Sequence, residues 1–286
     1  MNALFLVILA TFLGSGVSVL LKLGLHDLPP LLLTFARFGL ALLVFLPFYL
    51  WQRQKAGFSD LKVFIPVSVL PALNIIFFII GLQGTSASIA QSLYAGVPIL
   101  TAIISYFLLG ERFTARKIFG ALVGFLGVLV IVLLPAIQGG AAFNGNLFSN
   151  LLIFVGVVSF SVYTVICKKM QNRYSPFLFT FFFVLTSTII SLALLVFENH
   201  AVALQFSFRS WMIILYVSIV GTCLFYFLYQ KIIKTASPLV ASTILYLQPV
   251  FTVLLAMGIL GERPTPGFYV GGILALCGVA LVTSRK

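Results

Sequence analysis

The chain has 286 residues, of which 62% are hydrophobic and 8% are charged, and its formal net charge is +12. Soluble domains carry about 25% charged residues, so this composition excludes a water-soluble protein and places the chain in a bilayer. At about 20 residues per spanning helix, the chain holds roughly ten spans and leaves no room for a separate extramembrane domain.

Ten apolar segments follow one another along the chain, and each is long enough to cross a bilayer. Their apolar residues are continuous rather than alternating, which favours helices over the strands of a barrel. The first segment lacks the basic start of a signal peptide and is expected to be a membrane helix. The segments are residues 3–22, 31–51, 63–82, 86–109, 117–134, 149–168, 177–197, 211–230, 237–260 and 267–284.

Basic residues are distributed unevenly between the two ends of these segments. Arg37 lies within the second segment; of the others, thirteen lie on one side and three, Lys22, Arg209 and Arg263, lie on the other. By the positive-inside bias, the side with thirteen is cytoplasmic, so both termini are predicted to be cytoplasmic in the inner (plasma) membrane. The positive charge therefore records topology, and we expect no nucleic-acid partner.

The chain contains an internal repeat. Residues 86–131 align with residues 237–282 at an offset of 151, with twelve identities in 46 positions. The identities include Leu109-Gly110-Glu111-Arg112 against Leu260-Gly261-Glu262-Arg263, and an offset of 146 pairs Lys22 with Lys168 in the earlier part of each half. Five helices per half is an odd number, so residues 1–140 and 141–286 are predicted to be two inverted five-helix repeats.

Inverted repeats related by an axis in the membrane plane are typical of alternating-access transporters, which bind substrate between the repeats near the midplane. A channel and a membrane scaffold that transports nothing are the competing classes. No phosphate-binding loop, metal-ligand cluster or intramembrane acid pair is apparent, so we expect neither an enzyme nor a cofactor.

Several short motifs resemble the EamA family of the drug/metabolite transporter superfamily. They are Lys22 with Leu28-Pro29-Pro30 and Arg37, then Gly81-Leu82, Thr85-Ser86-Ala87-Ser88 and Ala90, then Pro98 and Leu109-Gly110-Glu111-Arg112. The resemblance implies efflux of small metabolites such as amino acids or related zwitterions. Drug or nucleotide-sugar-type carriers remain the alternative, as does either a monomer or a homodimer.

Polar residues within the spans are the candidate binding groups. Ser15, Ser18 and Lys22 form a stripe on the first helix, and the repeat gives Ser161, Thr164 and Lys168 the same spacing on the sixth. Such a duplicated stripe predicts two helices that face a central cavity, whereas close helix packing with lysines that reach the interface is the alternative.

Prolines within spans predict breaks that release backbone carbonyls. Pro98 and Pro249 would free the carbonyls of Tyr94 and Leu245, unless neighbouring hydroxyls satisfy the kinks. Around these breaks, Ser242 and Tyr246 share a face with Pro249, as Gln91 does with Pro98, whereas Gln248 points away from Tyr246. In the third segment, Pro71 accompanies Asn74, whose amide offers both a donor and an acceptor to a zwitterion.

Tyrosine and arginine side chains complete the candidate set. Tyr163 and Tyr226 are expected to contact a ligand, and Tyr229 to lie at the membrane interface. Arg37 either pairs with a substrate carboxylate or caps neighbouring carbonyls. No carboxylate or imidazole is expected at midplane depth, which predicts a uniporter or exchanger without proton coupling.

Overall fold

The computed structural model describes residues 3–25, 27–51, 57–84, 90, 93–138, 147–198, 207–260 and 266–284. These residues are helical apart from short turns, and none of them lies in a strand. The all-helical prediction is therefore confirmed for this part of the chain. The elements are α1 (Ala3–Gly24), α2 (Pro30–Trp51), α3 (Phe58–Leu82), α5 (Val97–Leu109), α6 (Ala115–Gln138), α7 (Leu147–Met170), α8 (Pro176–Leu194), η1 (Leu195–Phe197), α9 (Phe208–Ser218), η2 (Ile219–Leu224), α10 (Phe225–Thr235), α11 (Pro238–Ser242), α12 (Ile244–Leu260) and α13 (Pro266–Thr283).

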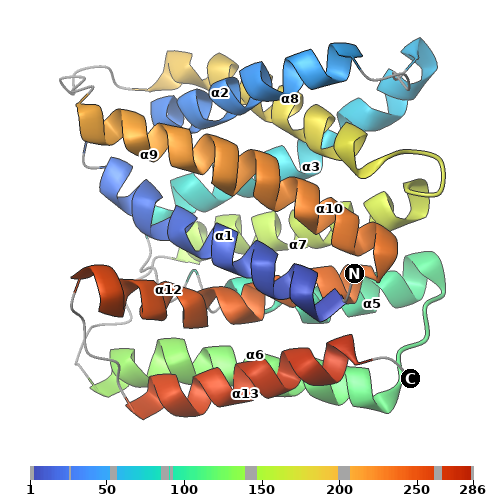
Figure 1. Ribbon diagram of the computed structural model, residues 1–286, viewed down its shortest axis with the longest axis vertical. Coiled ribbons are helices and arrows are strands. Elements are labelled where there is room, and N and C mark those ends of the chain that lie inside the picture. Colours follow the sequence, from blue (N-terminus) through green and yellow to red (C-terminus); the bar gives the residue numbers. More distant parts are fainter. Residues whose placement is uncertain are drawn as a thin grey trace.

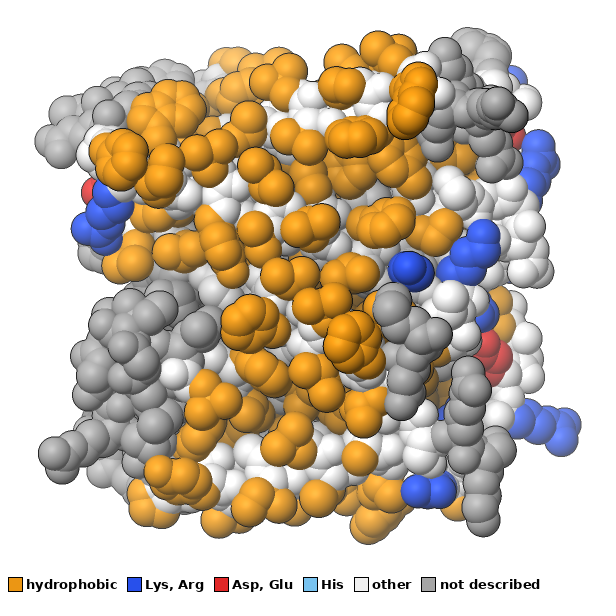
Figure 2. Space-filling view, viewed as in Figure 1, with side chains coloured by type: hydrophobic (Ala, Val, Ile, Leu, Met, Phe, Trp, Pro, Cys, Tyr) orange, Lys and Arg blue, Asp and Glu red, His pale blue; other side chains and the backbone are white. Residues whose placement is uncertain are grey.

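Among the described residues, six helical stretches are long and apolar enough to cross a membrane, namely Pro30–Trp51, Ser59–Gly81, Leu147–Met170, Pro176–Phe197, Phe208–Thr235 and Pro266–Thr283. Hydrophobic side chains cover the middle of the face seen in Figure 2, whereas most of its lysine and arginine side chains gather along the right-hand edge. The start of α1 and the end of α13 lie at that same edge (Figure 1). The surface thus has the apolar middle and charged rim of an integral membrane protein.

Most of the helices pack against one another in a central group, and α6 and α13 form a separate pair at its edge. Helix α1 contacts α9, α10 and α12, while α3 contacts α7 and α8, and α2 packs along α8 through aromatic pairs such as Phe38 with Phe183. Helices α6 and α13 pack on each other along their length at the bottom of Figure 1.

Glycines make the close contact between α6 and α13. A Cβ atom added at Gly127 would lie 2.5 Å from the backbone nitrogen of Ala275 and 2.7 Å from the carbonyl oxygen of Gly271. One added at Gly120 would lie 2.9 Å from the carbonyl oxygen of Gly278. The two helices therefore run antiparallel, and small residues allow their backbones to approach closely within one chain.

Two predicted spans that contain prolines expected to break them are interrupted in the structure. The segment 86–109 turns at Ala95 and Gly96 before α5 begins, and the segment 237–260 breaks at Thr243, between α11 and α12. Pro98 stands in the first turn of α5, where a helix needs no N–H from it, so the break precedes this proline rather than occurring at it.

The other two helix-break prolines lie inside continuous helices. Pro249 lies within α12 and Pro71 within α3. Next to Pro71, the carbonyl oxygen of Leu70 accepts a hydrogen bond of 2.8 Å from the Ser159 hydroxyl of α7. This hydrogen bond joins α7 to α3 beside Pro71, although the carbonyl that Pro71 leaves without its helical partner is that of Val67, four residues earlier.

The α6–α13 contact generates a prediction about stability. Replacing Gly127 with Ala should destabilise the protein by about 1–3 kcal/mol, because the new methyl group meets backbone atoms that have no room to move. Thermal unfolding of the purified protein in detergent measures the change.

Gly39→Ala in α2 is the matched control, because its added Cβ atom would come no closer than 3.9 Å to Phe35. This helical substitution should leave stability unchanged or raise it by about 0.5–1 kcal/mol. Equal melting temperatures for the two variants would contradict the proposed contact.

Candidate functional site

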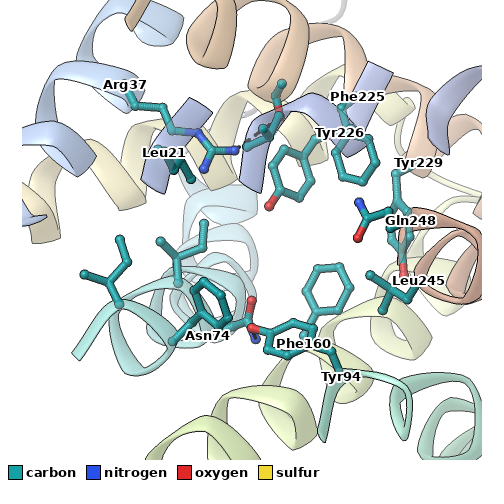
Figure 3. A pocket seen from close by; sticks show the side chains of 16 residues that line it. Leu21, Arg37, Asn74, Tyr94, Phe160, Phe225, Tyr226, Tyr229, Leu245 and Gln248 are labelled. Atoms are coloured by element: carbon teal, nitrogen blue, oxygen red, sulfur yellow. Dashed lines mark hydrogen bonds between the residues drawn. The ribbon is translucent and has the colours of Figure 1, made fainter. Parts of the chain in front are cut away.

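A cavity of about 150 Å³ lies at the centre of the helix bundle, where side chains from both halves of the chain converge (Figure 3). Its walls are mainly apolar and aromatic, with a few polar groups at separate positions. The lining residues are Gly14, Val17, Leu21, Arg37, Asn74, Ile75, Phe78, Ile79, Tyr94, Phe160, Gly221, Phe225, Tyr226, Tyr229, Leu245 and Gln248.

Arg37 brings a positive charge to this cavity. Its side chain is 6% exposed, and Nε donates to the Thr222 hydroxyl at 2.7 Å while Nη2 donates to the Gly221 carbonyl at 3.2 Å. Both acceptors belong to η2, a π-helical turn that offers these groups because its backbone bonds run to the fifth residue rather than the fourth. No carboxylate among the described residues bonds to Arg37, so its charge meets only neutral partners, which also include the Tyr226 side chain and the Phe38 ring, whose centroid lies 5.2 Å from Cζ.

Gly221 also determines how closely α1 approaches this π-helical turn. A Cβ atom there would lie 2.3 Å from Cγ2 of Val17, so any larger residue would displace α1. The same small residue thus permits the helix contact and presents its carbonyl to Arg37.

Asn74 and Tyr94 form a neutral polar group on the side of the cavity away from Arg37 (Figure 3). The Asn74 amide nitrogen donates to the Tyr94 hydroxyl at 2.6 Å and to the Gly156 carbonyl at 2.8 Å. These bonds fix the amide orientation and leave its side-chain oxygen, to which no described residue donates, as an acceptor for a ligand. The structure thus brings Asn74, Tyr94 and Tyr226 of the predicted set to one cavity.

The expected orientation of Tyr246 and Gln248 is reversed. Gln248 points its amide into the cavity (Figure 3), whereas Tyr246 is fully buried. The ring of Tyr246 packs against Gly124 of α6, close enough that a Cβ added at Gly124 would lie 2.5 Å from it. The glycine on α6 makes the space that this tyrosine occupies, a contact that helix periodicity does not reveal.

Tyr229 is also placed differently from the interfacial position expected for it. It is 1% exposed, lines the cavity, and shares a hydrogen bond of 3.0 Å with the Thr164 hydroxyl. The expectation failed because the distance of a residue from a helix end does not tell whether that face meets lipid or another helix.

The described side chains of the duplicated stripe, those of Ser15, Ser161, Thr164 and Lys168, do not line the cavity, and neither does Ser242. Ser15 donates to the Phe12 carbonyl at 2.9 Å, Ser161 to Val157 at 2.9 Å and Ser242 to Leu239 at 2.8 Å. All three are fully buried between helices, because such a hydroxyl can bond to a carbonyl three or four residues back on its own helix. The side chains of Ser18 and Lys22, and Gln91 altogether, lie outside the described residues.

A buried polar cluster joins α7 to α10 beyond Tyr229. The Gln230 amide nitrogen donates to the Tyr163 hydroxyl at 2.8 Å and to the Cys167 sulfur at 3.5 Å, while the Gln171 amide donates to Gln230 Oε1 at 2.7 Å. We call these four residues the α7–α10 polar cluster. Its members are at most 2% exposed, so it fills the space between the two helices at this end.

Lys168 strengthens the same end of the bundle. Its ammonium group donates to the carbonyls of Ile233, Lys234 and Ala236 at 2.9–3.2 Å, where α10 ends. A cation at a helix C-terminus meets carbonyls that have no helical partner.

Nearby, burial raises the pKa of the Glu111 carboxyl above its usual value, although the charges of Lys168 and Lys117 act in the opposite direction.

The described carboxylates lie at helix ends and not in the cavity. Glu198 accepts from the backbone N–H groups of Leu31 and Leu32 at 2.6 and 2.7 Å, and so caps the start of α2. Asp27 accepts from the Ser210 hydroxyl at 2.9 Å, and Asp60 forms a 3.1 Å ion pair with Arg173. These acids secure the ends of helices.

The other end of the cavity is apolar. Leu21 and Ile79 line it, and Ile79 also borders a neighbouring cavity of about 550 Å³ that reaches Gln83 and Glu198. The central cavity is therefore bounded by hydrogen-bonded side chains at one end and by aliphatic side chains at the other.

Comparisons with known proteins place this helical chain in a family. Residues 1–133 and 147–284 match the EamA-like transporter family. The chain belongs to this family. An uncharacterized transporter of Archaeoglobus fulgidus is 26% identical over 284 residues, which cover 98% of this chain and 97% of that protein. The uncharacterized transporter YoaV of Bacillus subtilis is 25% identical over 97% of this chain and 95% of its own.

One solved structure, described as the crystal structure of a protein, superimposes with a TM-score of 0.80 over 98% of this chain and 95% of that chain. Its sequence identity of 20% supports the fold alone. Together with the apolar helices, these findings identify the protein as a multi-pass membrane transporter of the EamA-like family.

Sequence reasoning missed several lining residues of this EamA-like protein, above all Phe160, Phe225 and Gln248. The internal repeat held a usable signal for one of them, because Phe225 is the counterpart of the candidate Asn74 at an offset of 151. Phe160 had none, since its counterpart at an offset of 146, Gly14, was not itself a candidate. Gln248 had no such signal, since its counterpart Val97 does not line the cavity.

If the hydrogen bonds of the α7–α10 polar cluster hold these two helices together, breaking them should let α7 and α10 separate. Gln230→Leu removes the amide partner of Tyr163 and one of the two acceptors of Gln171, whose amide also donates to the Gln230 carbonyl at 3.0 Å, and each buried polar group left unsatisfied costs about 1–3 kcal/mol. We expect α7 and α10 to separate more often, so a water-soluble maleimide should label Cys167 faster in a background in which Cys223 and Cys277 are Ser.

Thr235→Val is the control on α10, because the Thr235 hydroxyl bonds only within its own helix, to Lys231, in this part of the structure. It should leave the labelling rate unchanged. A Gln230→Leu protein that labels at the parental rate would show that the cluster does not hold these helices together.

Proposed function

We propose that this protein exports small zwitterionic metabolites, amino acids or close relatives, across the plasma membrane by alternating access, as a uniporter or exchanger. The observation that carries the proposal is the buried guanidinium of Arg37, which lines the central cavity and bonds to no described carboxylate. A substrate that brings its own carboxylate supplies the missing counter-charge.

Burying the charge of Arg37 within the membrane costs free energy that a substrate carboxylate can recover. A charged side chain at membrane depth costs at least about 2.5–3.5 kcal/mol, which the neutral dipoles of Gly221 and Thr222 only partly offset. A bidentate carboxylate–guanidinium pair uses donors that these two bonds leave available. The binding of a carboxylate thus relieves a cost that is built into the empty site.

The opposite wall suits an ammonium group. The side-chain oxygen of Asn74 is a neutral acceptor, and the rings of Phe160, Phe225 and Tyr229 also line the cavity. Ring faces attract cations and do not require an anion that would compete for Arg37. The two ends of a zwitterion therefore find different partners on different walls.

The cavity size favours a small solute. A cavity of about 150 Å³ accommodates a benzene-sized molecule. A nucleotide sugar is several times larger, so this conformation supports an amino-acid-sized substrate over that alternative.

Four observations support two inverted repeats as the basis of transport. The family match divides into two stretches, 1–133 and 147–284. The contact of α1 with α12 has its repeat counterpart in the contact of α7 with α5, and that of α3 with α7 in that of α10 with α1. The repeat-related helices α6 and α13 run antiparallel, as inverted copies would. Finally, α1 begins and α13 ends at the edge that is richest in basic side chains on the face shown in Figure 2.

Several residues that line the cavity lie at equivalent positions of the internal repeat. At an offset of 151, Asn74, Ile75 and Phe78 of α3 correspond to Phe225, Tyr226 and Tyr229 of α10, and Tyr94 corresponds to Leu245. All of these residues line the cavity. A site on the pseudo-two-fold axis would be lined in this way, and such a site is exposed alternately when one repeat rocks against the other.

The two ends of the cavity differ where the repeat would make them equivalent. Tyr163, Cys167 and Gln171 of the polar cluster correspond to Val17, Leu21 and Leu25 at an offset of 146, and Gln230 corresponds to Ile79 at an offset of 151. Hydrogen bonds thus close the cytoplasmic end in the proposed topology, while aliphatic contacts guard the outer end. Closure at one end supports a carrier over a channel.

The positions of the acids support transport without proton coupling. Asp27, Asp60 and Glu198 are bonded at helix ends, and Glu111 lies in the loop between α5 and α6. A proton-coupled carrier generally needs an ionisable group that faces the alternating site. We therefore expect flux to follow the substrate gradient.

Cysteine accessibility tests the inverted topology. In a variant whose three native cysteines are Ser, a membrane-impermeant maleimide applied to intact cells should label Leu147→Cys at the outer end of α7. It should not label Ser59→Cys at the start of α3, which becomes reactive after the membrane is opened. Both positions are exposed, so burial does not hide either. Labelling of both from one side would overturn the inverted arrangement.

Substrate exchange in proteoliposomes tests the role of Arg37. Arg37→Gln should lower counterflow of a neutral amino acid such as alanine by at least about tenfold, because hydrogen bonds to charged groups contribute about 1.5–3 kcal/mol. Arg37→Lys should retain part of the flux, since lysine keeps the positive charge but lacks the paired N–H donors of the guanidinium group. An imposed pH gradient should leave parental flux unchanged.

Arg173→Gln is the matched control, since Arg173 is exposed and pairs with Asp60 outside the cavity. It should exchange alanine at the parental rate. Parental counterflow by an Arg37→Gln protein of normal thermal stability would contradict the carboxylate pairing, and accumulation of alanine driven by the pH gradient would contradict the uncoupled mechanism.

A further inference from the structure

Helices α5 and α6 diverge and leave a cleft that the central cavity does not use. Helix α5 packs against α7 and α11, whereas α6 packs mainly against α13. Between them lies a cleft of about 510 Å³, whose floor includes Leu239 and Ala121, both almost completely buried. The two helices are thus held by different partners, and the space between them opens at the surface.

The walls of this cleft are apolar. Phe107 is 77% exposed, and Ile103, Ile118 and Leu122 are about half exposed. All four lie within helices that cover the apolar belt of the protein, where the surrounding medium is lipid. The lining residues are Ile99, Ala102, Ile103, Tyr106, Phe107, Arg112, Phe113, Ile118, Ala121, Leu122 and Leu239.

One end of the cleft is cationic. Arg112 is the charged residue among those that line it, is exposed, and has no bond to another described residue. Arg116 and Lys117 follow within the next five positions, in the first turn of α6. The carboxylate of Glu111 is half-buried and nearer to Lys168 and Lys117, so a net positive charge remains at the mouth.

We propose that the α5–α6 cleft binds an anionic phospholipid, with an acyl chain along the apolar walls and the phosphate held by Arg112 and Arg116. A cleft of about 510 Å³ has room for one chain, which would gain van der Waals contacts with the apolar walls, because lipid already in the bilayer has no hydrophobic driving force to enter it. Basic residues at membrane-facing clefts recognise anionic headgroups. Charge complementarity therefore selects an acidic lipid over a neutral lipid or a second protein copy.

This site is independent of the proposed transport activity, because none of its lining residues lines the central cavity. An acyl chain held there would fill the gap between a helix of the central group and the outlying α6–α13 pair.

Fluorescence quenching by brominated lipids tests the proposal. Trp51 and Trp211 are the two tryptophans of the chain. With both changed to Phe, Phe107→Trp places one exposed probe in the cleft. In vesicles that contain brominated phosphatidylglycerol or brominated phosphatidylcholine, the probe should report about a fivefold preference for the anionic lipid per cation engaged.

Arg112→Gln in the probe variant should abolish most of this preference, whereas Arg173→Gln should retain it, since that arginine is paired with Asp60 and lies outside the cleft. Ala102→Phe should reduce quenching by both lipids, because the larger side chain fills the cleft. Equal quenching by the two lipids in the parental probe variant, or a preference that survives Arg112→Gln, would overturn the proposal. A probe that neither lipid quenches would mean that protein covers the cleft, which would also overturn it.

Discussion

Hydrocarbon offers no hydrogen-bond partner to a backbone N–H or C=O group, and this constraint organises the whole structure. Helices are tolerated everywhere in the bundle, but a helix can be interrupted only where protein or a wet cavity meets the freed groups. The turn at Ala95 and Gly96, the break at Thr243 and the π-helical turn at Ile219–Leu224 are flanked by, or contain, residues that line the central cavity, such as Tyr94, Leu245 and Gly221. The site thus forms where the backbone departs from regular helix.

The same constraint explains how a buried arginine persists in the bundle. Arg37 would be intolerable against lipid, but the π-helical turn brings the Gly221 carbonyl and the Thr222 hydroxyl within hydrogen-bond distance. Those neutral acceptors hold the guanidinium in place without cancelling its charge. The repeat gives Arg37 no cationic counterpart, since Phe183 occupies the related position. The duplicated sequence therefore carries a cavity whose positive charge lies on one side.

The two ends of the bundle also differ chemically, since one is held by hydrogen bonds and the other by aliphatic contacts. At the α7–α10 polar cluster, four hydrogen-bonding side chains of the second half occupy positions whose counterparts in the first half are aliphatic. Hydrogen bonds are directional and are lost together when helices separate, whereas aliphatic contacts weaken gradually. In the proposed mechanism, the hydrogen-bonded end of the cavity therefore opens in one step, whereas the aliphatic end opens gradually. Meanwhile the glycine contact of α6 with α13 holds an outlying pair whose helices never reach the cavity.

The sequence alone determined that this chain is a helical membrane protein of the EamA-like family, because composition, segment length and local motifs do not depend on how helices face one another. It also identified Asn74, Tyr94, Tyr226 and Arg37 as candidates, since polar groups are rare in such spans. Tertiary structure decided which polar groups face the cavity. A serine such as Ser15 or Ser161 satisfies itself on its own helix, so its polarity does not fix its direction. Gln248 faces the cavity and Tyr246 faces Gly124 because contacts between distant helices set the rotation of α12, and no local pattern contains those contacts.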